Sequence, residues 1–228
     1  FCLSRGLGDV YKRQSQGRFA RLAGAEGVGN DTRVVVYDQK GLFSAARAWW
    51  LFRYFGHQKV AVLDGGLPKW LAEQRATEAG EPAATGERSF QVNVHARKLR
   101  GLGDVLEAIE RDDTLILDAR AANRFDGSTA EARPGVASGH IPGSQNLPFS
   151  RLLRSDHTLQ PAETLRTLFS AAGVDGKKPV ITSCGSGVTA TVLLLGLEVA
   201  GLPEGALYDG SWTEWGSRAD TPKATGVV

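Results

Sequence analysis

Sulfur-containing residues are scarce in this sequence of 228 residues, which has no methionine and two cysteines, Cys2 and Cys184. Two cysteines are too few for a disulfide framework, so a reducing compartment such as the cytoplasm is expected. No apolar run approaches the roughly 20 residues that a membrane-spanning helix needs. Basic residues number 27 and acidic residues 25, and this balance gives no support for a nucleic-acid partner. A hydrophobic content of 42% is enough for the cores of one large or two small domains.

Residues 1–14 differ from the rest of the sequence. They show neither helical nor strand periodicity, and they contain the whole excess of positive charge. The segment resembles translated sequencing-adapter text, so we expect a non-native leader and exclude it from the fold prediction. Without the leader, Cys184 has no partner for an intrachain disulfide. The absence of methionine predicts a fragment. Any targeting signal would lie upstream of it, so a mitochondrial or exported location stands beside the cytoplasmic one.

Cys184 lies at the centre of the most informative stretch of the sequence. A β-rich run over 179–182 precedes it, five small or hydroxyl residues follow it, and a helical pattern then begins. This order predicts a strand-to-helix turn. The backbone N–H groups of such a turn and the positive end of the following helix favour an anion, and such surroundings favour the reactive thiolate form of a cysteine. We therefore interpret Cys184 as a reactive thiol and not as a buried space-filling residue.

Strands and helices are predicted to alternate along the chain. Apolar and β-branched runs predict strands over 33–37, 60–63, 114–117 and 206–208, and amphipathic or apolar patterns predict helices over 42–55, 102–111, 161–172 and 188–200. A long polar, glycine-containing segment over 121–143 is predicted to be a functional loop. Alternation of this kind is typical of an α/β fold, in which helices cover a parallel sheet.

An internal repeat divides the sequence. The order of strand, turn, helix, strand, Asp-Gly and tryptophan occurs twice, from Asp38 to Asp64 and from Cys184 to Asp209. We infer two copies of one domain: a shortened first copy over 15–76, a linker over 77–100 and a second copy over 101–228. The first copy has far fewer residues before Asp38 than the second has before Cys184, so its early strands are predicted to be missing. Because a carboxylate cannot act as a sulfur nucleophile, only the second copy is expected to be active.

Several short motifs occur in a fixed order along the chain. They are Val35-Val36-Tyr37-Asp38, Leu63-Asp64-Gly65-Gly66, Asp118-Ala119-Arg120, Gly139-His140-Ile141-Pro142-Gly143, Cys184-Gly185-Ser186-Gly187-Val188-Thr189 and Gly210-Ser211-Trp212. Together they resemble the tandem-domain sulfurtransferases of the rhodanese superfamily, in particular those that use 3-mercaptopyruvate. The resemblance implies two rhodanese-like domains, each a parallel sheet flanked by helices, with the first domain incomplete and inactive.

The resemblance also implies a ping-pong reaction at Cys184. The thiolate would attack the sulfur of 3-mercaptopyruvate and become a persulfide as pyruvate leaves. The outer sulfur would then pass to cyanide or to an acceptor thiol such as thioredoxin. No metal and no cofactor other than this covalent persulfide is expected, and the chain is expected to be a monomer without nucleic-acid or membrane partners.

The nature of the sulfur donor can be argued from charge. Relatives that prefer thiosulfate carry Arg and Lys directly after the cysteine, whereas this chain has two neutral residues there. A neutral loop favours 3-mercaptopyruvate, whose carboxylate and ketone need a guanidinium fork. By resemblance, Arg124 and Arg133 supply this fork. The predicted substrate-binding residues of the loop are Gly185, Ser186, Gly187, Val188 and Thr189.

Other functions account for fewer of these features. A phosphatase of rhodanese-like fold needs an arginine six positions after the cysteine, where this chain has Ala190. A thiosulfate sulfurtransferase and a non-enzymatic interaction module are the alternatives, and Asp38 makes the second plausible for the first copy alone.

His140 is interpreted as a turn-shaping residue and not as a partner of Cys184. Family members use an Asp and a His of the early first domain to assist the cysteine, and His57 does not match that pattern, so we expect reduced turnover from this chain.

Overall fold

A computed structural model describes residues 15–80 and 86–226, so the predicted leader over 1–14, with Cys2, lies outside the described residues. The chain divides into two compact units between Ala96 and Arg97, with Asp156–Thr158 grouped with the first. This division falls within the segment predicted as a linker. No helix among the described residues combines the length and the apolar character needed to cross a membrane.

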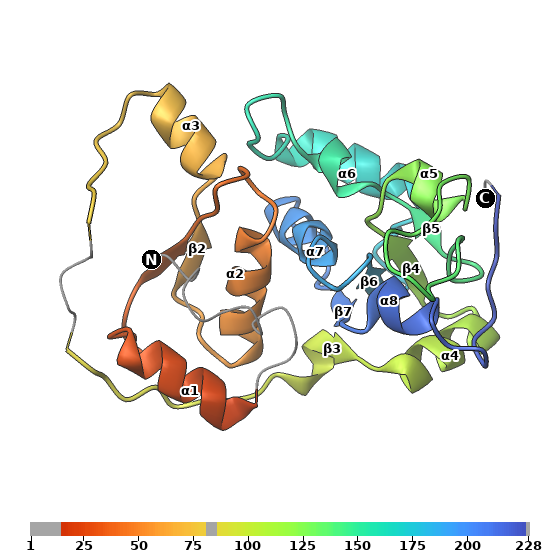
Figure 1. Ribbon diagram of the computed structural model, residues 1–228, viewed down its shortest axis with the longest axis horizontal. Coiled ribbons are helices and arrows are strands. Elements are labelled where there is room, and N and C mark those ends of the chain that lie inside the picture. The colour runs from red at the N-terminus through yellow and green to blue at the C-terminus, as the bar shows by residue number, and fades with distance from the viewer. Residues whose placement is uncertain (1–14, 81–85, 227–228) are drawn as a thin grey trace. The chain divides into compact units, whose positions relative to one another are not determined.

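The first unit is a small α/β arrangement around a two-stranded parallel sheet (Figure 1). Val34 pairs with Val60 in the register of this sheet, and Phe19 stacks on Phe55 in the core at a ring distance of 4.3 Å. Its elements are α1 (Gln16–Ala25), β1 (Val34–Val36), α2 (Ala45–Tyr54), β2 (Val60–Val62) and α3 (Gly66–Ala72). The predicted strands are confirmed, but the helix predicted from residue 42 begins at Ala45.

The late start of α2 has a local cause in Asp38. Its Oδ2 accepts hydrogen bonds from the backbone N–H groups of Phe43, Ser44 and Ala45 at 2.7 to 2.8 Å, and its Oδ1 accepts one from Lys40 at 2.8 Å. The turn is therefore wrapped around a carboxylate, which satisfies donors that the first turn of a helix leaves unpaired. The first copy thus forms an N–H cradle for an anion at the position that matches Cys184.

Replacing Asp38 with alanine is expected to loosen this turn, because one carboxylate serves four donors. A loss of about 2 kcal/mol in local stability corresponds to amide hydrogen exchange about 30-fold faster at Phe43, Ser44 and Ala45. Asp31→Ala is the matched control, since Asp31 is an exposed carboxylate of the same unit that pairs with Arg88. Equal exchange at these amides in the two variants would contradict the role given to Asp38.

The second unit contains a five-stranded parallel sheet in the order β3-β7-β6-β4-β5. The sheet and its helices confirm the predicted α/β class, although the two-residue strands β3 and β5 and the short helices α5 and α8 were not predicted. The elements are β3 (Leu99–Arg100), α4 (Leu102–Arg111), β4 (Leu115–Asp118), α5 (Ala122–Phe125), β5 (Gln145–Asn146), the 3-10 turn η2 (Phe149–Leu152), α6 (Ala162–Ala171), β6 (Val180–Ser183), α7 (Ala190–Val199), β7 (Ala206–Tyr208) and α8 (Ser211–Trp215).

Helices cover both faces of this sheet (Figure 1). On one face, α4 and α8 pack against the strands through a buried cluster: Val105, Ala108, Ile116, Ile141, Ile181, Tyr208, Trp212 and Trp215. On the other face lie α6 and α7, and α7 is buried along nearly its whole length. Gly196 lets α7 approach its neighbours, because a β-carbon there would lie 2.6 Å from the side chain of Leu152 and 3.2 Å from that of Phe169. A helix enclosed in this way is expected to be apolar on nearly every side, and the sequence of α7 is apolar except at Thr191 and Glu198.

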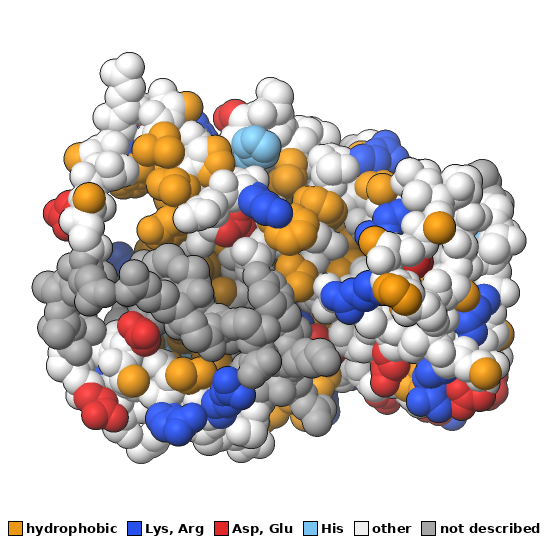
Figure 2. Space-filling model, viewed as in Figure 1, with side chains coloured by type: hydrophobic (Ala, Val, Ile, Leu, Met, Phe, Trp, Pro, Cys, Tyr) orange, Lys and Arg blue, Asp and Glu red, His pale blue; other side chains and the backbone are white. Residues whose placement is uncertain are grey.

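The visible surface of the second unit carries charges of both signs. Lys and Arg side chains and Asp and Glu side chains are both visible on the face shown in Figure 2. No single-sign patch covers that face, as expected from the near-neutral composition.

Candidate active site

The site forms where two neighbouring central strands of the second unit end. Strands β4 and β6 are parallel, with Asp118 opposite Ser183, and the N–H of Ala119 donates to the carbonyl of Ser183 at 2.8 Å. Cys184 follows directly. The carboxyl ends of strands in an open parallel sheet are where ligands bind in such folds. The predicted strand-to-helix turn is therefore confirmed and lies at the edge of the sheet that suits a reaction centre.

The sulfur of Cys184 is held inside its turn. The residue is only 1% exposed, and the backbone N–H of Gly187 points at Sγ from 3.1 Å. Gly187 has a φ of +78°, and a β-carbon there would lie 2.8 Å from the carbonyl oxygen of Asp209. Only glycine fits this position. An N–H donor at this distance stabilises a negatively charged sulfur, whether thiolate or persulfide.

The backbone of Cys184 is held by a segment that the sequence analysis did not assign to the site. The Oγ of Ser211 accepts a hydrogen bond from the N–H of Cys184 at 3.1 Å and donates one to the carbonyl of Tyr208 at 2.8 Å. The N–H of Trp212 donates to the carbonyl of Cys184 at 2.9 Å. Ser211 has a φ of +51°, which is uncommon for a residue other than glycine and is found where surrounding contacts fix it. The Gly-Ser-Trp motif was the sequence signal for this role.

The remaining loop residues are placed by α8 and by the start of α7. The carbonyl of Gly185 accepts two hydrogen bonds from Thr213, one from the backbone N–H at 2.9 Å and one from Oγ1 at 2.5 Å. Val188 is buried, and its carbonyl accepts the Thr191 hydroxyl at 2.6 Å. Ser186 and Thr189 are half-buried. The loop is thus a defined cradle, while its contacts with a substrate stay a prediction.

Both predicted arginines lie near Gly185. A β-carbon on Gly185 would lie 3.2 Å from Nη2 of Arg124, so this guanidinium occupies the space that glycine leaves open. Arg133 is linked to the same loop through Thr213 of α8, because its Nη1 donates to Oγ1 of Thr213 at 3.1 Å and that hydroxyl donates to the carbonyl of Gly185. The structure brings these side chains together from loop and helix positions far from Cys184 in the sequence.

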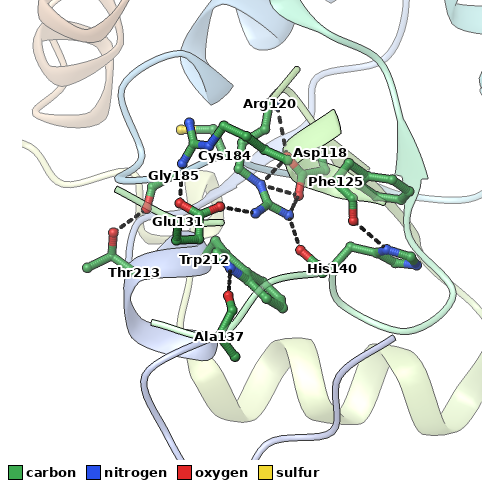
Figure 3. Close-up of polar contacts among 12 residues, drawn as sticks. Asp118, Arg120, Phe125, Glu131, Ala137, His140, Cys184, Gly185, Trp212 and Thr213 are labelled. Atoms are coloured by element: carbon green, nitrogen blue, oxygen red, sulfur yellow. Dashed lines mark hydrogen bonds and ion pairs between the residues drawn. The ribbon is translucent and has the colours of Figure 1, made fainter. Parts of the chain in front are cut away.

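Glu131, Arg120 and Asp118 form a chain of buried charges (Figure 3). Glu131 pairs with Arg124 at 2.5 Å and with Arg120 at 2.8 Å, and Arg120 in turn pairs with Asp118 at 2.7 Å. The guanidinium of Arg120 also lies over the ring of Trp212, 4.6 Å from the ring centre. The sequence analysis used the Asp-Ala-Arg motif only for the resemblance and did not identify Glu131.

His140 faces away from the cysteine. Its Nδ1 lies 2.8 Å from the carbonyl of Phe125, and its ring stacks on that of Phe125 at 3.9 Å (Figure 3). Its backbone pairs with Ala224. These contacts agree with the interpretation of His140 as a residue that shapes the chain path.

Two further observations bear on the chemistry of the site. Burial, together with a hydrogen bond to Glu214, raises the pKa of Tyr208 well above its usual range, so this phenol stays neutral and serves packing. In the part of the chain that the structure describes, no group of three or more His, Cys, Asp or Glu side chains is arranged to hold a metal ion.

Comparisons with known proteins identify the family. A family model described as the rhodanese-like domain matches residues 4–73 and 102–218. The chain is 42% identical to thiosulfate/3-mercaptopyruvate sulfurtransferase 1, mitochondrial, from Arabidopsis thaliana, over 90% of this chain and 59% of that protein. It is 43% identical to the 3-mercaptopyruvate sulfurtransferase of Escherichia coli K12, over 86% of this chain and 69% of that protein.

Solved structures agree with this assignment. The crystal structure of a 3-mercaptopyruvate sulfotransferase from Escherichia coli matches with a TM-score of 0.77 and 40% identity, over 88% of this chain and 74% of that one. The Tum1 protein of Saccharomyces cerevisiae matches with a TM-score of 0.82 and 29% identity, over 93% of this chain and 75% of that one. The chain thus spans between 59% and 75% of these proteins. With the rhodanese-like fold and the cysteine turn in place, the chain belongs to the rhodanese family.

Proposed function

We propose that this chain carries the reaction centre of a sulfurtransferase that moves a sulfane sulfur from 3-mercaptopyruvate to a thiol or cyanide. The observation that supports it most is the Sγ of Cys184, which lies in a backbone cradle at the end of β6 with a guanidinium beside the same loop. An anionic sulfur and an anionic donor can be stabilised there together.

The proposed reaction has two halves at Cys184. In the first, the thiolate forms a bond to the sulfur of 3-mercaptopyruvate, the donor's carbon–sulfur bond breaks, and the carbon takes the electron pair and a proton to give pyruvate. In the second, an acceptor thiolate or cyanide attacks the outer sulfur, and the sulfur–sulfur bond breaks to return the thiolate of Cys184. No net oxidation occurs, so no redox cofactor is needed. The N–H of Gly187, 3.1 Å from Sγ, is placed to donate to the sulfur that carries the negative charge in these steps.

The donor is proposed from the charges around the loop. Gly185 and Ser186 are neutral, Arg124 lies beside Gly185, and Arg133 is linked to Gly185 through Thr213. Two guanidiniums at its rim suit a donor whose carboxylate lies away from the reacting sulfur. Thiosulfate is the second candidate, because relatives carrying the name thiosulfate sulfurtransferase are similar to this chain as well. A thiol such as thioredoxin in a reducing compartment is the proposed acceptor.

The donor assignment predicts a preference that steady-state rates can measure. With cyanide as acceptor, kcat/KM for 3-mercaptopyruvate is expected to exceed that for thiosulfate by at least about tenfold. Ser186→Lys is expected to lower the ratio of these two kcat/KM values, because a lysine next to the reacting sulfur would favour the doubly charged thiosulfate. An equal or higher kcat/KM with thiosulfate would contradict 3-mercaptopyruvate as the donor and favour thiosulfate. A folded chain inactive with both donors would favour the interaction module.

A further inference from the structure

Glu131 is a buried carboxylate shared by two arginines. It lies in the loop between α5 and β5, and its side chain is 4% exposed. Oε1 accepts from Nη1 of Arg120 at 2.8 Å, and Oε2 accepts from Nη2 of Arg124 at 2.5 Å. Burying a carboxylate costs free energy unless each oxygen has a strong partner, so its position is set by these contacts.

Arg120 is the fixed end of this arrangement. Its side chain is 1% exposed, and three hydrogen bonds of 2.7 to 3.1 Å join it to the carboxylate of Asp118. Its Nη2 also donates to the carbonyl of Gly139 at 2.8 Å, and Trp212 lies under the guanidinium plane. These contacts fix the orientation of the Arg120 guanidinium. Glu131 is therefore tied to a rigid point of the sheet edge.

Arg124 is the adjustable end. Its side chain is 37% exposed and comes from α5, a helix of four residues. Its Nη2 faces both Glu131 and the open position at Gly185. Among the described residues, Glu131 is the carboxylate with which Arg124 forms an ion pair. The direction of this guanidinium toward the Cys184 loop thus depends on Glu131.

We propose that Glu131 is a positioning residue that presents Arg124 to the carboxylate of the sulfur donor and so selects carboxylate-bearing donors. This inference rests on the proposed function, because it concerns the donor site of that same reaction. Glu131 touches neither the donor nor the sulfur and acts through Arg124. If Glu131 acted only as a negative charge near Cys184, its removal would make Cys184 react faster with anionic reagents. The positioning role predicts that its removal makes this reaction slower.

The first test is Glu131→Gln, which keeps the size of the side chain but leaves one acceptor oxygen for two guanidiniums. Arg120 retains Asp118 and Gly139, so Arg124 is the side chain that loses its position. The KM for 3-mercaptopyruvate is expected to rise about tenfold, with kcat changed by less than about threefold. Glu163→Gln is the matched control, since Glu163 is an exposed carboxylate paired with Arg166 on α6, and neither constant is expected to change.

The second test does not require sulfur transfer. Cys184 is alkylated by the anion iodoacetate or by neutral iodoacetamide, and each rate is measured on the peptide that contains Cys184. The rate with iodoacetate divided by the rate with iodoacetamide is high when a cation lies close to the sulfur. Glu131→Gln and Arg124→Gln are each expected to lower this ratio about fivefold, and the double variant is expected to lower it no further. An unchanged or higher ratio in Glu131→Gln overturns the inference. If the ratio is lowered but the parent chain transfers no sulfur, the proposed function is refuted and the positioning role of Glu131 is not.

A further variant keeps the test decisive if Glu131→Gln does not fold. Gly185→Ala leaves the carboxylate untouched and places a methyl group 3.2 Å from Nη2 of Arg124, a contact closer than usual. The iodoacetate to iodoacetamide ratio is expected to fall in this variant too, because the guanidinium must move. An unchanged ratio would show that Arg124 does not face the loop and would overturn the inference.

Discussion

Replacing Cys184 with serine is expected to lower sulfur transfer by more than about a thousandfold, from either donor to cyanide. The hydroxyl oxygen cannot form a persulfide, so the first half of the reaction has no nucleophile. Within the described residues Cys184 is the free cysteine. Thiocyanate formation measures the loss directly.

The matched control is Cys2→Ser, which changes the other cysteine of the sequence. Full activity is expected in this variant, because the proposed reaction uses Cys184 alone. Circular dichroism of Cys184→Ser should match that of the parent chain, since one atom is exchanged inside an intact turn. Loss of activity in Cys2→Ser, or retained activity in Cys184→Ser, would contradict the assignment of the nucleophile.

Replacing Arg120 with methionine is expected to destabilise the second unit by about 3–5 kcal/mol. The substitution leaves Asp118 and Glu131, whose side chains are 2% and 4% exposed, without their shared guanidinium. An uncompensated buried carboxylate is among the costliest single defects in a protein core. Chemical denaturation of the intact chain, with amide hydrogen exchange in β4 and β6, measures the loss and places it in the second unit.

Arg111→Met is the matched control for Arg120. Arg111 lies on α4, is 64% exposed and pairs with Glu107 one turn away, so a much smaller loss is expected. Similar losses in the two variants would mean that the charges around Arg120 are not buried as the structure places them.

The cysteine turn was predictable because its determinants are local. A β-rich run, a Gly-Ser-Gly loop and an apolar helix are adjacent in the sequence, and strand β6 and helix α7 follow one another around Cys184 as expected. The helix begins at Ala190 and not at residue 188, since the residues before it form the cradle. The same effect delays α2 in the first unit, where the turn wraps around Asp38.

The supports of the site were not predictable in the same way. Ser211 is 27 positions from Cys184, and it caps the backbone of Cys184 only because the ends of β6 and β7 meet at one edge of the sheet. Glu131 lies in a segment without periodicity, and its role follows from two ion pairs that tertiary structure creates. Strands β3 and β5 have two residues each, too few for an alternating pattern to be recognised.

The Asp38 turn gives an internal comparison for the chemistry of Cys184. Its carboxylate accepts four backbone N–H groups, which shows that this sequence pattern builds a turn able to hold an anion. In the second unit the corresponding residue carries sulfur, and the N–H of Gly187 is aimed at it. The two turns thus share a backbone N–H aimed at the side chain that occupies this position.

The central claim is that Cys184 carries the transferred sulfur, and the mass of its peptide tests this most directly. After the chain is mixed with 3-mercaptopyruvate without an acceptor, the peptide containing Cys184 is expected to gain the mass of one sulfur atom as one pyruvate is released. Cyanide should then remove that mass and yield thiocyanate. Release of pyruvate from the folded chain with no mass gain at Cys184 would contradict the account.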